Sequence, residues 1–178
     1  AQLREDEFVD LVRFMSELGK EGKYKTTTNR FARSWEVLPA GSRNPGTVHH
    51  YGAKMFTQEF SGYKWKPFYA MVGGAIPVEE VPVALKRIAD EYQVLRTYVE
   101  VTKAGKHKIR LKGDSNHIEL FLDGEPIEIP SDRKDSELEI DCKKTGKRQL
   151  MLVLLGARSS GQVSLEALSE ELTMVNSL

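Results

Sequence analysis

Aromatic side chains are the first residues of this 178-residue sequence that could recognise a ligand. Trp35, Trp65 and Tyr69, with Tyr63 and Phe68 beside the last two, could form a platform on which a sugar ring stacks. Aromatic residues also bury more area than other side chains, so in a domain of this size they more often belong to the core. The pattern therefore allows two interpretations, a sugar-binding surface or part of the interior.

Histidines and carboxylates offer two further places for chemistry. The pair His49-His50 could bind a metal or shuttle protons, but a closed metal site needs further converging ligands, and the spacing supplies none. An acidic run could bind a hard cation such as calcium on one face of a strand, or it could face solvent beside the flanking lysines and arginines. We expect the solvated face and no metal site; the run consists of Asp132, Asp135, Glu137, Glu139 and Asp141.

Catalytic motifs are missing from the sequence. It contains no Walker loop, GxGxxG fingerprint, GxSxG elbow, HExxH pair or CxxCH haem motif. Because no nucleophile–base pair can be argued from spacing, we expect no enzyme and no catalytic residue. The single cysteine, Cys142, excludes an internal disulfide and a cysteine-based zinc site. We therefore expect an inert buried thiol and no cofactor in this chain.

Alternating apolar and polar residues dominate the second half of the chain. In residues 117–129, Ile118, Leu120 and Leu122 alternate with polar or outward positions, and Asp123-Gly124 supplies a tight hairpin turn. The same period recurs over 95–101, 107–111, 137–142 and 163–167, whereas 149–155 is apolar on both faces and should be a central strand. Strands at this spacing predict a mainly β protein, an antiparallel β-sandwich of jelly-roll or lectin-like type.

The N-terminal part follows a different period. Residues 1–20 place apolar side chains at helical spacing and predict an α-helix, which could be the end of a preceding domain. Residues 21–30 are polar and basic and predict a linker, so the sandwich domain should cover 31–178. A lone helix of this length is marginal in water, so we expect residues 5–18 to pack against a neighbouring domain or a partner chain. The apolar side chains at helical spacing form one stripe, which consists of Phe8, Leu11, Val12, Phe14, Met15 and Leu18.

The overall composition limits the partners. The 26 basic and 26 acidic side chains cancel, so no net field draws the protein toward nucleic acid. The longest apolar run, residues 150–155, is too short to span a membrane. Because the sequence has no initiator methionine and no recognisable signal peptide, we expect a processed form or a fragment of a longer protein.

Three segments together resemble a known group of proteins. They are EFVDLVRFMSELGKEGKY followed by WEVLP, then YKWKPFYAMVGGAIPVEEVP, then YVEVTKAGKHKIRLKGDSNHIELFLDGEPIEI. In this order they resemble the C-terminal part of large secreted bacterial proteins of the haem-binding, membrane-bound-dehydrogenase type. The resemblance implies that residues 1–20 are the last helix of a c-type cytochrome domain, with haem in that neighbouring domain. It also implies an extracytoplasmic location, periplasmic or secreted.

The third segment is also similar to protective-antigen-type, lectin-like sandwiches. In their sugar-binding members, consecutive aspartates in a turn hold calcium; here Asp114 and Asn116 occupy the matching turn and the paired aspartates are absent. We expect a non-catalytic accessory domain that interacts with neighbouring domains, a partner chain or a glycan. The alternative is a carbohydrate-binding module, with or without calcium, that uses Asp114, Asn116, Trp35, Trp65 and Tyr69.

Overall fold

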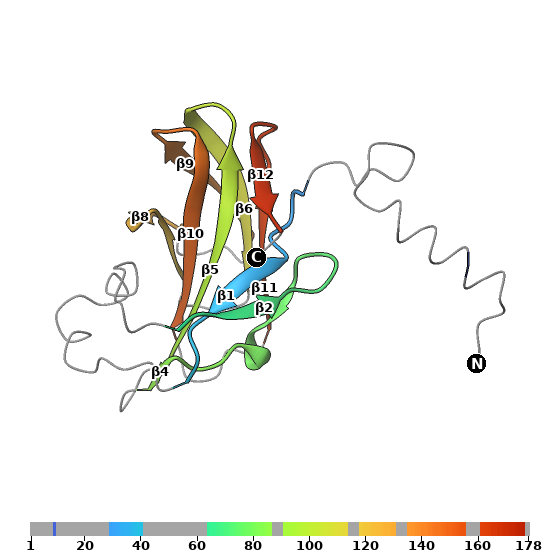
Figure 1. Ribbon diagram of the computed structural model, residues 1–178. Coiled ribbons are helices and arrows are strands. Elements are labelled where there is room, and N and C mark those ends of the chain that lie inside the picture. Colours follow the sequence, from blue (N-terminus) through green and yellow to red (C-terminus); the bar gives the residue numbers. More distant parts are fainter. Residues whose placement is uncertain are drawn as a thin grey trace.

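The computed structural model describes most of the predicted sandwich region (Figure 1). The described residues are Val9, 29–40, 64–86, 91–113, 118–130, 135–155 and 161–176. The predicted helix over 1–20, apart from Val9, and most of the linker lie outside these residues, as do His49, His50, Asp114 and Asn116. Within the described part of 29–176 no α-helix occurs.

The larger sheet has eight strands, and its neighbours all pair antiparallel. Its main path runs β2-β1-β5-β10-β7-β8, and β4 and β12 also pair with β5. The strand β10 pairs with β5 on one side and β7 on the other, which confirms that the segment apolar on both faces is central. The strands are β1 (Ser34–Val37), β2 (Lys66–Tyr69), β4 (Leu85–Lys86), β5 (Glu91–Val101), β7 (Ile118–Leu122), β8 (Glu125–Ile127), β10 (Gly146–Leu155) and β12 (Leu172–Val175).

The smaller sheet has four strands in the order β3-β11-β6-β9, again antiparallel. They are β3 (Ile76–Pro77), β6 (Gly105–Gly113), β9 (Asp135–Cys142) and β11 (Gln162–Ala167), and the 3-10 turn η2 (Val78–Glu80) follows β3. Two antiparallel sheets packed face to face confirm the predicted mainly β sandwich.

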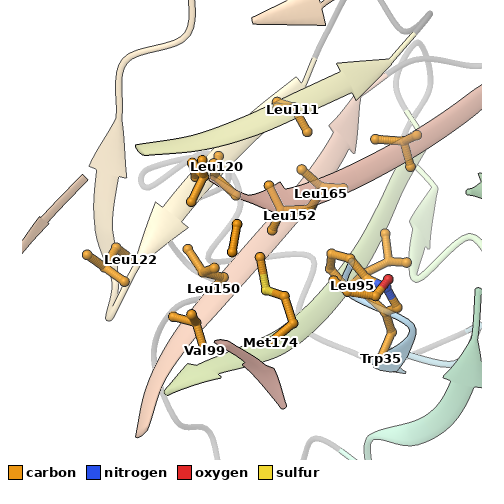
Figure 2. Packing of buried hydrophobic residues seen from close by; sticks show 14 of the residues in the cluster. Trp35, Leu95, Val99, Leu111, Leu120, Leu122, Leu150, Leu152, Leu165 and Met174 are labelled. Carbon is orange, nitrogen blue, oxygen red and sulfur yellow. The ribbon is translucent and has the colours of Figure 1, made fainter. Parts of the chain in front are cut away.

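The core lies between the two sheets (Figure 2). Leu150 and Leu152 of β10 and Leu95 of β5 belong to the same buried cluster as Leu111 and Leu165 of the smaller sheet. A second buried cluster covers the outer face of the larger sheet and includes Val94, Phe121, Met151 and Val153. Because successive strand residues point to opposite faces, β10 contributes to both clusters, which explains its continuous apolar sequence.

The predicted hairpin is confirmed between β7 and β8. Leu120 pairs with Ile127 and Leu122 with Glu125, and the two turn residues both have positive φ, 49° at Asp123 and 86° at Gly124. Positive φ at both central positions is the turn that matches the twist of two antiparallel strands. The turn places the side chain of Asp123 against the start of β10, where it contributes to the site described below.

The first and last segments of the sandwich lie side by side. The Met174 N–H donates to the Asn29 carbonyl over 2.8 Å, which also places the described end of the predicted linker against β12. Asn176 holds the residues that lead into β1: its Oδ1 accepts from the Arg33 N–H (2.7 Å) and the Ser34 N–H (3.2 Å), and its Nδ2 donates to the Phe31 carbonyl (3.1 Å).

Candidate functional site

A cleft lies on the side of the sandwich where β8 and β9 are the end strands of the two sheets. Its volume is about 550 Å³. Residues of β8 form one wall and residues of β9 the other, and the turn at Asp123 and the start of β10 close one end. The lining residues are Leu122, Asp123, Glu125, Pro126, Ile127, Glu128, Glu139, Ile140, Asp141, Lys143 and Arg148. A cleft of this volume falls within the roughly 300–1,000 Å³ typical of sites for small ligands.

The end of the cleft is held by a bridge between the hairpin turn and β10. The Nε of Arg148 donates to Asp123 Oδ2 over 2.7 Å, and the backbone N–H of Gln149 donates to Asp123 Oδ1 over 3.0 Å. The Asp123 N–H in turn donates to the Gln149 carbonyl (2.9 Å). The two bonds with Gln149 hold Asp123 in place, and its carboxylate orients the guanidinium of Arg148, so the position of Arg148 at the cleft is set before any ligand arrives.

Carboxylates outnumber cations along the cleft. Lys143 and Arg148 are the two cationic lining residues, against five carboxylates, which are Asp123, Glu125, Glu128, Glu139 and Asp141. The Lys106 Nζ lies 2.7 Å from Glu139 Oε1, and this hydrogen bond, more than the charge of Glu139, raises the pKa of Lys106. Two of these carboxylates already have partners, Asp123 in Arg148 and the Gln149 N–H and Glu139 in Lys106, and Pro126 and Ile127 add a short apolar surface.

Cys142 is buried at the end of β9, as its alternation predicts. Burial raises the pKa of its thiol, the charge of Asp123 adds to that effect, and Arg148 opposes it. A thiol with a raised pKa is neutral at pH 7 and a poor nucleophile. Cys142 therefore packs as a small apolar residue, as expected.

The structure separates the three aromatic residues predicted to bind a ligand. Trp35 is 1% exposed, and its Nε1 donates to the Ala32 carbonyl over 3.0 Å, so its ring belongs to the core and offers no surface for a sugar. Trp65 is partly buried, and the Arg96 guanidinium lies 4.2 Å from its ring centroid. Tyr69 is 69% exposed on β2. Neither Trp65 nor Tyr69 lines the cleft.

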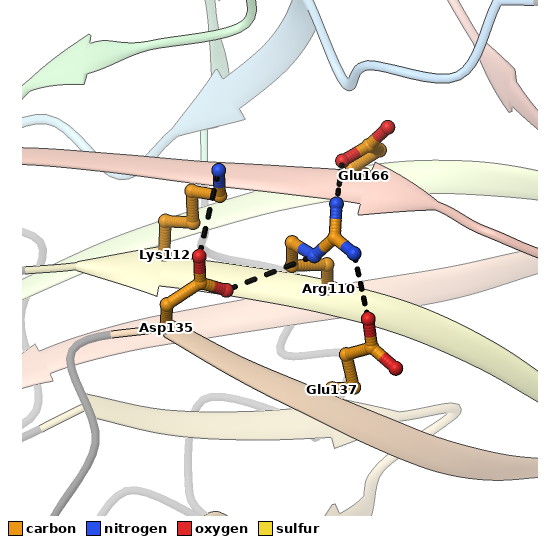
Figure 3. A network of polar contacts seen from close by, with 5 residues as sticks. All are labelled: Arg110, Lys112, Asp135, Glu137 and Glu166. Carbon is orange, nitrogen blue, oxygen red and sulfur yellow. Dashed lines mark hydrogen bonds and ion pairs between the residues drawn. The ribbon is translucent and has the colours of Figure 1, made fainter.

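Asp135 and Glu137 of the acidic run form an ion-paired outer face on β9, and Asp132 lies outside the described residues (Figure 3). Arg110 of β6 contacts Glu137 (2.6 Å), Glu166 of β11 (3.1 Å) and Asp135 (3.7 Å), and Lys112 contacts Asp135 over 3.5 Å. The hydrogen bond to Glu137 raises the pKa of Arg110, which burial opposes. Across the described residues no group of three or more histidines, cysteines or carboxylates could hold a metal ion.

His107 of β6 is buried. Its Nε2 lies 2.7 Å from the Lys103 carbonyl oxygen, and its Nδ1 lies 3.9 Å from Glu171. A backbone carbonyl therefore satisfies the ring of His107, which supports a structural role. His117 lies outside the described residues, as do Asp114 and Asn116.

Sequence reasoning missed the cleft because its walls come from strands that do not pair with each other. The strands β8 and β9 are neighbours along the chain, but they end different sheets. The one available signal was the density of carboxylates from Asp123 to Asp141, which follows the predicted turn. On a single strand, those carboxylates indicate only a charged outer face.

Comparison with known proteins finds similar solved structures and no family. No family model and no curated protein matches the sequence. Among solved structures, the chain is similar to the PA14 domain of the antifreeze protein MpAFP, with 10% identity, a TM-score of 0.38, and coverage of 82% of this chain and 87% of that one. It is also similar to a subtype-switched epithelial adhesin A domain from Candida glabrata, solved in complex with β-lactose, with 12% identity, a TM-score of 0.39, and coverage of 82% and 85%.

A larger enzyme also appears among the similar structures. The α-xylosidase of family GH31 from Xanthomonas citri is 11% identical with a TM-score of 0.39, and the match covers 84% of this chain. The chain spans only 17% of the length of that enzyme.

The cytochrome and dehydrogenase context implied by the sequence resemblance stays a prediction. No helix in the described part of the chain is long and apolar enough to cross a membrane.

Proposed function

We propose that this chain is a non-catalytic carbohydrate-binding module of lectin-like type, and that a saccharide occupies the cleft between β8 and β9. The observation that carries the proposal is the lining of that cleft. It brings acidic residues of β8 and β9 beside one pre-oriented arginine, Arg148, and a short apolar surface at Pro126 and Ile127.

Each part of this lining matches a part of a sugar ring. Hydroxyl groups donate to carboxylates, and hydrogen bonds that involve a charged group are about twice as strong as neutral ones. The Arg148 guanidinium donates to ring or hydroxyl oxygens, and its contact with Asp123 fixes the direction of its N–H groups. The apolar face of a pyranose packs against Pro126 and Ile127. Binding therefore needs no metal and no cofactor in this chain.

A glycan array measured with the purified chain tests the proposal. It is run once with calcium and once with a chelator, because the turn that carries Asp114 and Asn116 is the position at which the family resemblance implies calcium. We expect one class of saccharide to bind under both conditions. Binding of no saccharide would refute the proposal, and hydrolysis of the bound saccharide would refute its non-catalytic part.

A matched pair of variants places the site. In Glu125→Gln with Asp141→Asn, two exposed cleft carboxylates become amides of the same shape, and we expect affinity to fall at least about tenfold, or 1.4 kcal/mol. In Glu79→Gln with Glu80→Gln, two exposed carboxylates of η2 change in the same way outside the cleft, and affinity should stay the same. Equal affinity of the two double variants would place the saccharide elsewhere.

The second candidate function is that of an accessory interaction domain in an extracytoplasmic multidomain protein. It is favoured by a surface that the cleft does not use, the exposed apolar residues at the end of β2. The two functions are compatible, because a binding module needs attachment to the protein that it serves. In this proposal the module is periplasmic or secreted, and haem belongs to a neighbouring cytochrome domain.

A further inference from the structure

An exposed apolar surface lies where the chain enters the sandwich. Its members are Phe31 (38% exposed), Tyr69 (69%), Met71 (52%) and Val72 (87%), and we call these four residues the apolar tip. They account for all but one of the exposed large apolar residues in the described parts of the chain; the other is Val9. Exposed apolar residues that gather in one place mark sites of interaction, whereas scattered ones need no explanation.

Backbone hydrogen bonds bring the apolar tip together and hold its shape. Ser34 of β1 pairs with Tyr69 of β2, and the Ala70 N–H donates to the Arg33 carbonyl over 2.8 Å. The turn after β2 is closed by two 2.8 Å bonds, from Met71 N–H to the Ala75 carbonyl and from Gly74 N–H to the Met71 carbonyl. The turn packs closely against Phe31, because a Cβ placed on Gly74 would lie only 2.8 Å from the Phe31 Cβ.

The chain itself provides a segment of matching chemistry close by. The 28 residues before Asn29 contain the predicted amphipathic stripe over 5–18, and Val9 belongs to that segment. Asn29 lies two residues before Phe31 of the apolar tip. Its carbonyl accepts a hydrogen bond from the Met174 N–H of β12. The eleven residues that follow Leu18, up to Asn29, can extend roughly 35–40 Å at about 3.3–3.6 Å per residue, enough for the stripe to fold back onto the tip.

The charges of the two surfaces are complementary. Residues 4–18 carry five acidic and two basic side chains. The two segments that build the apolar tip, 29–37 and 64–76, carry exposed cations at Arg30, Lys64 and Lys66. Their one carboxylate, Glu36, is held by Arg96 at 2.7 Å. The acidic amphipathic segment and the exposed cations of the segments that build the apolar tip are therefore opposite in charge.

We propose that residues 5–18 dock on the apolar tip of the same chain, as an intramolecular partner. The apolar stripe covers Phe31, Tyr69, Met71 and Val72, and the acidic residues beside the stripe face Arg30, Lys64 and Lys66. This contact does not involve the cleft. It fixes the orientation of whatever precedes the sandwich in a longer protein, while the cleft on the other sheet edges stays open to its ligand.

Methionine oxidation measures the contact in the full chain. Hydrogen peroxide converts an exposed methionine thioether to the sulfoxide, so the rate at Met71 reports whether the tip is covered, and fully buried Met174 serves as the internal reference. The stripe is broken by Leu11→Asp with Met15→Asp. The matched control, Gln2→Asp with Ser16→Asp, adds the same two charges on the opposite side of the predicted helix.

We expect Met71 to oxidise several-fold more slowly in the wild type and the control than in the stripe variant, at every protein concentration. Equal rates in all three proteins would overturn the proposal. Protection that increases with protein concentration would also overturn it, because the occupant would then be a second copy. As a reciprocal test, Tyr69→Ser with Val72→Ser should speed hydrogen exchange over residues 5–18; unchanged exchange there would count against docking.

Discussion

Replacement of Asp123 by alanine tests the bridge that holds the end of the cleft. The substitution removes three contributions. The hydrogen bond from the Gln149 N–H is worth about 1 kcal/mol net. The partly exposed ion pair with Arg148 is worth about 0.5–1 kcal/mol. The third contribution is the tolerance of aspartate for φ of 49°, which alanine lacks at a cost of about 1 kcal/mol.

Together these contributions predict a loss of about 2–3 kcal/mol in the free energy of unfolding. For a chain of this length that loss corresponds to a fall in Tm of about 5–10 °C. Asp123→Asn is the informative control, because asparagine tolerates positive φ and its amide oxygen still accepts from the Gln149 N–H. It loses only the charge, so we expect a cost of about 0.5–1 kcal/mol.

Urea denaturation followed by circular dichroism measures both variants, and equal slopes with respect to urea show that the unfolded states are comparable. The reasoning is refuted if the two variants lose the same stability to within about 0.3 kcal/mol, since the hydrogen bond to Gln149 and the backbone conformation would then contribute nothing.

Further predictions concern the turn, the core, one strand carboxylate and the thiol. Gly124→Val should cost a few kcal/mol in urea denaturation, because a β-branched residue does not adopt φ of 86°. Leu152→Ala should cost about 2–5 kcal/mol by the same measurement, since Leu152 is fully buried between the sheets. Burial raises the pKa of Glu119, so the free energy of unfolding should fall as pH rises from its unfolded to its folded pKa. Glu119→Gln should therefore raise Tm at pH 7. This gain should vanish below about pH 4, where the carboxyl is protonated in both states. Cys142 should react with a thiol reagent only upon unfolding, and rapid labelling of the native protein would contradict its burial.

The second half of the fold was predictable because its signals are local. Alternation along β6, β9 and β11 places one face of each strand in the core, and the turn at Asp123-Gly124 fixes the register of β7 against β8. The continuous apolar sequence of β10 indicates a strand covered on both faces, and both buried clusters contain its residues.

The candidate site could not be predicted in the same way. Trp35 and Trp65 are the same residue type, and only their positions relative to the sheet decide that one is core and the other packs against Arg96. The acidic residues of β9 look alike in the sequence, yet Glu137 is paired by Arg110 and Asp141 lines the cleft. Each difference depends on which strand lies opposite, and that is a property of the tertiary pairing.

The contact between the two ends of the sandwich determines how the module responds to mechanical tension. Asn29 lies beside Met174, and Phe31, Arg33 and Ser34 lie beside Asn176, so the two end segments run in the same direction. A force that pulls the flanking chains apart draws these segments past each other in opposite directions. The bonds between them, including the 2.7 Å bond from Ser34 Oγ to the Asn176 carbonyl, then carry the load together rather than one after another. A force applied through the two flanking chains therefore loads these few hydrogen bonds in shear, the direction in which they resist best.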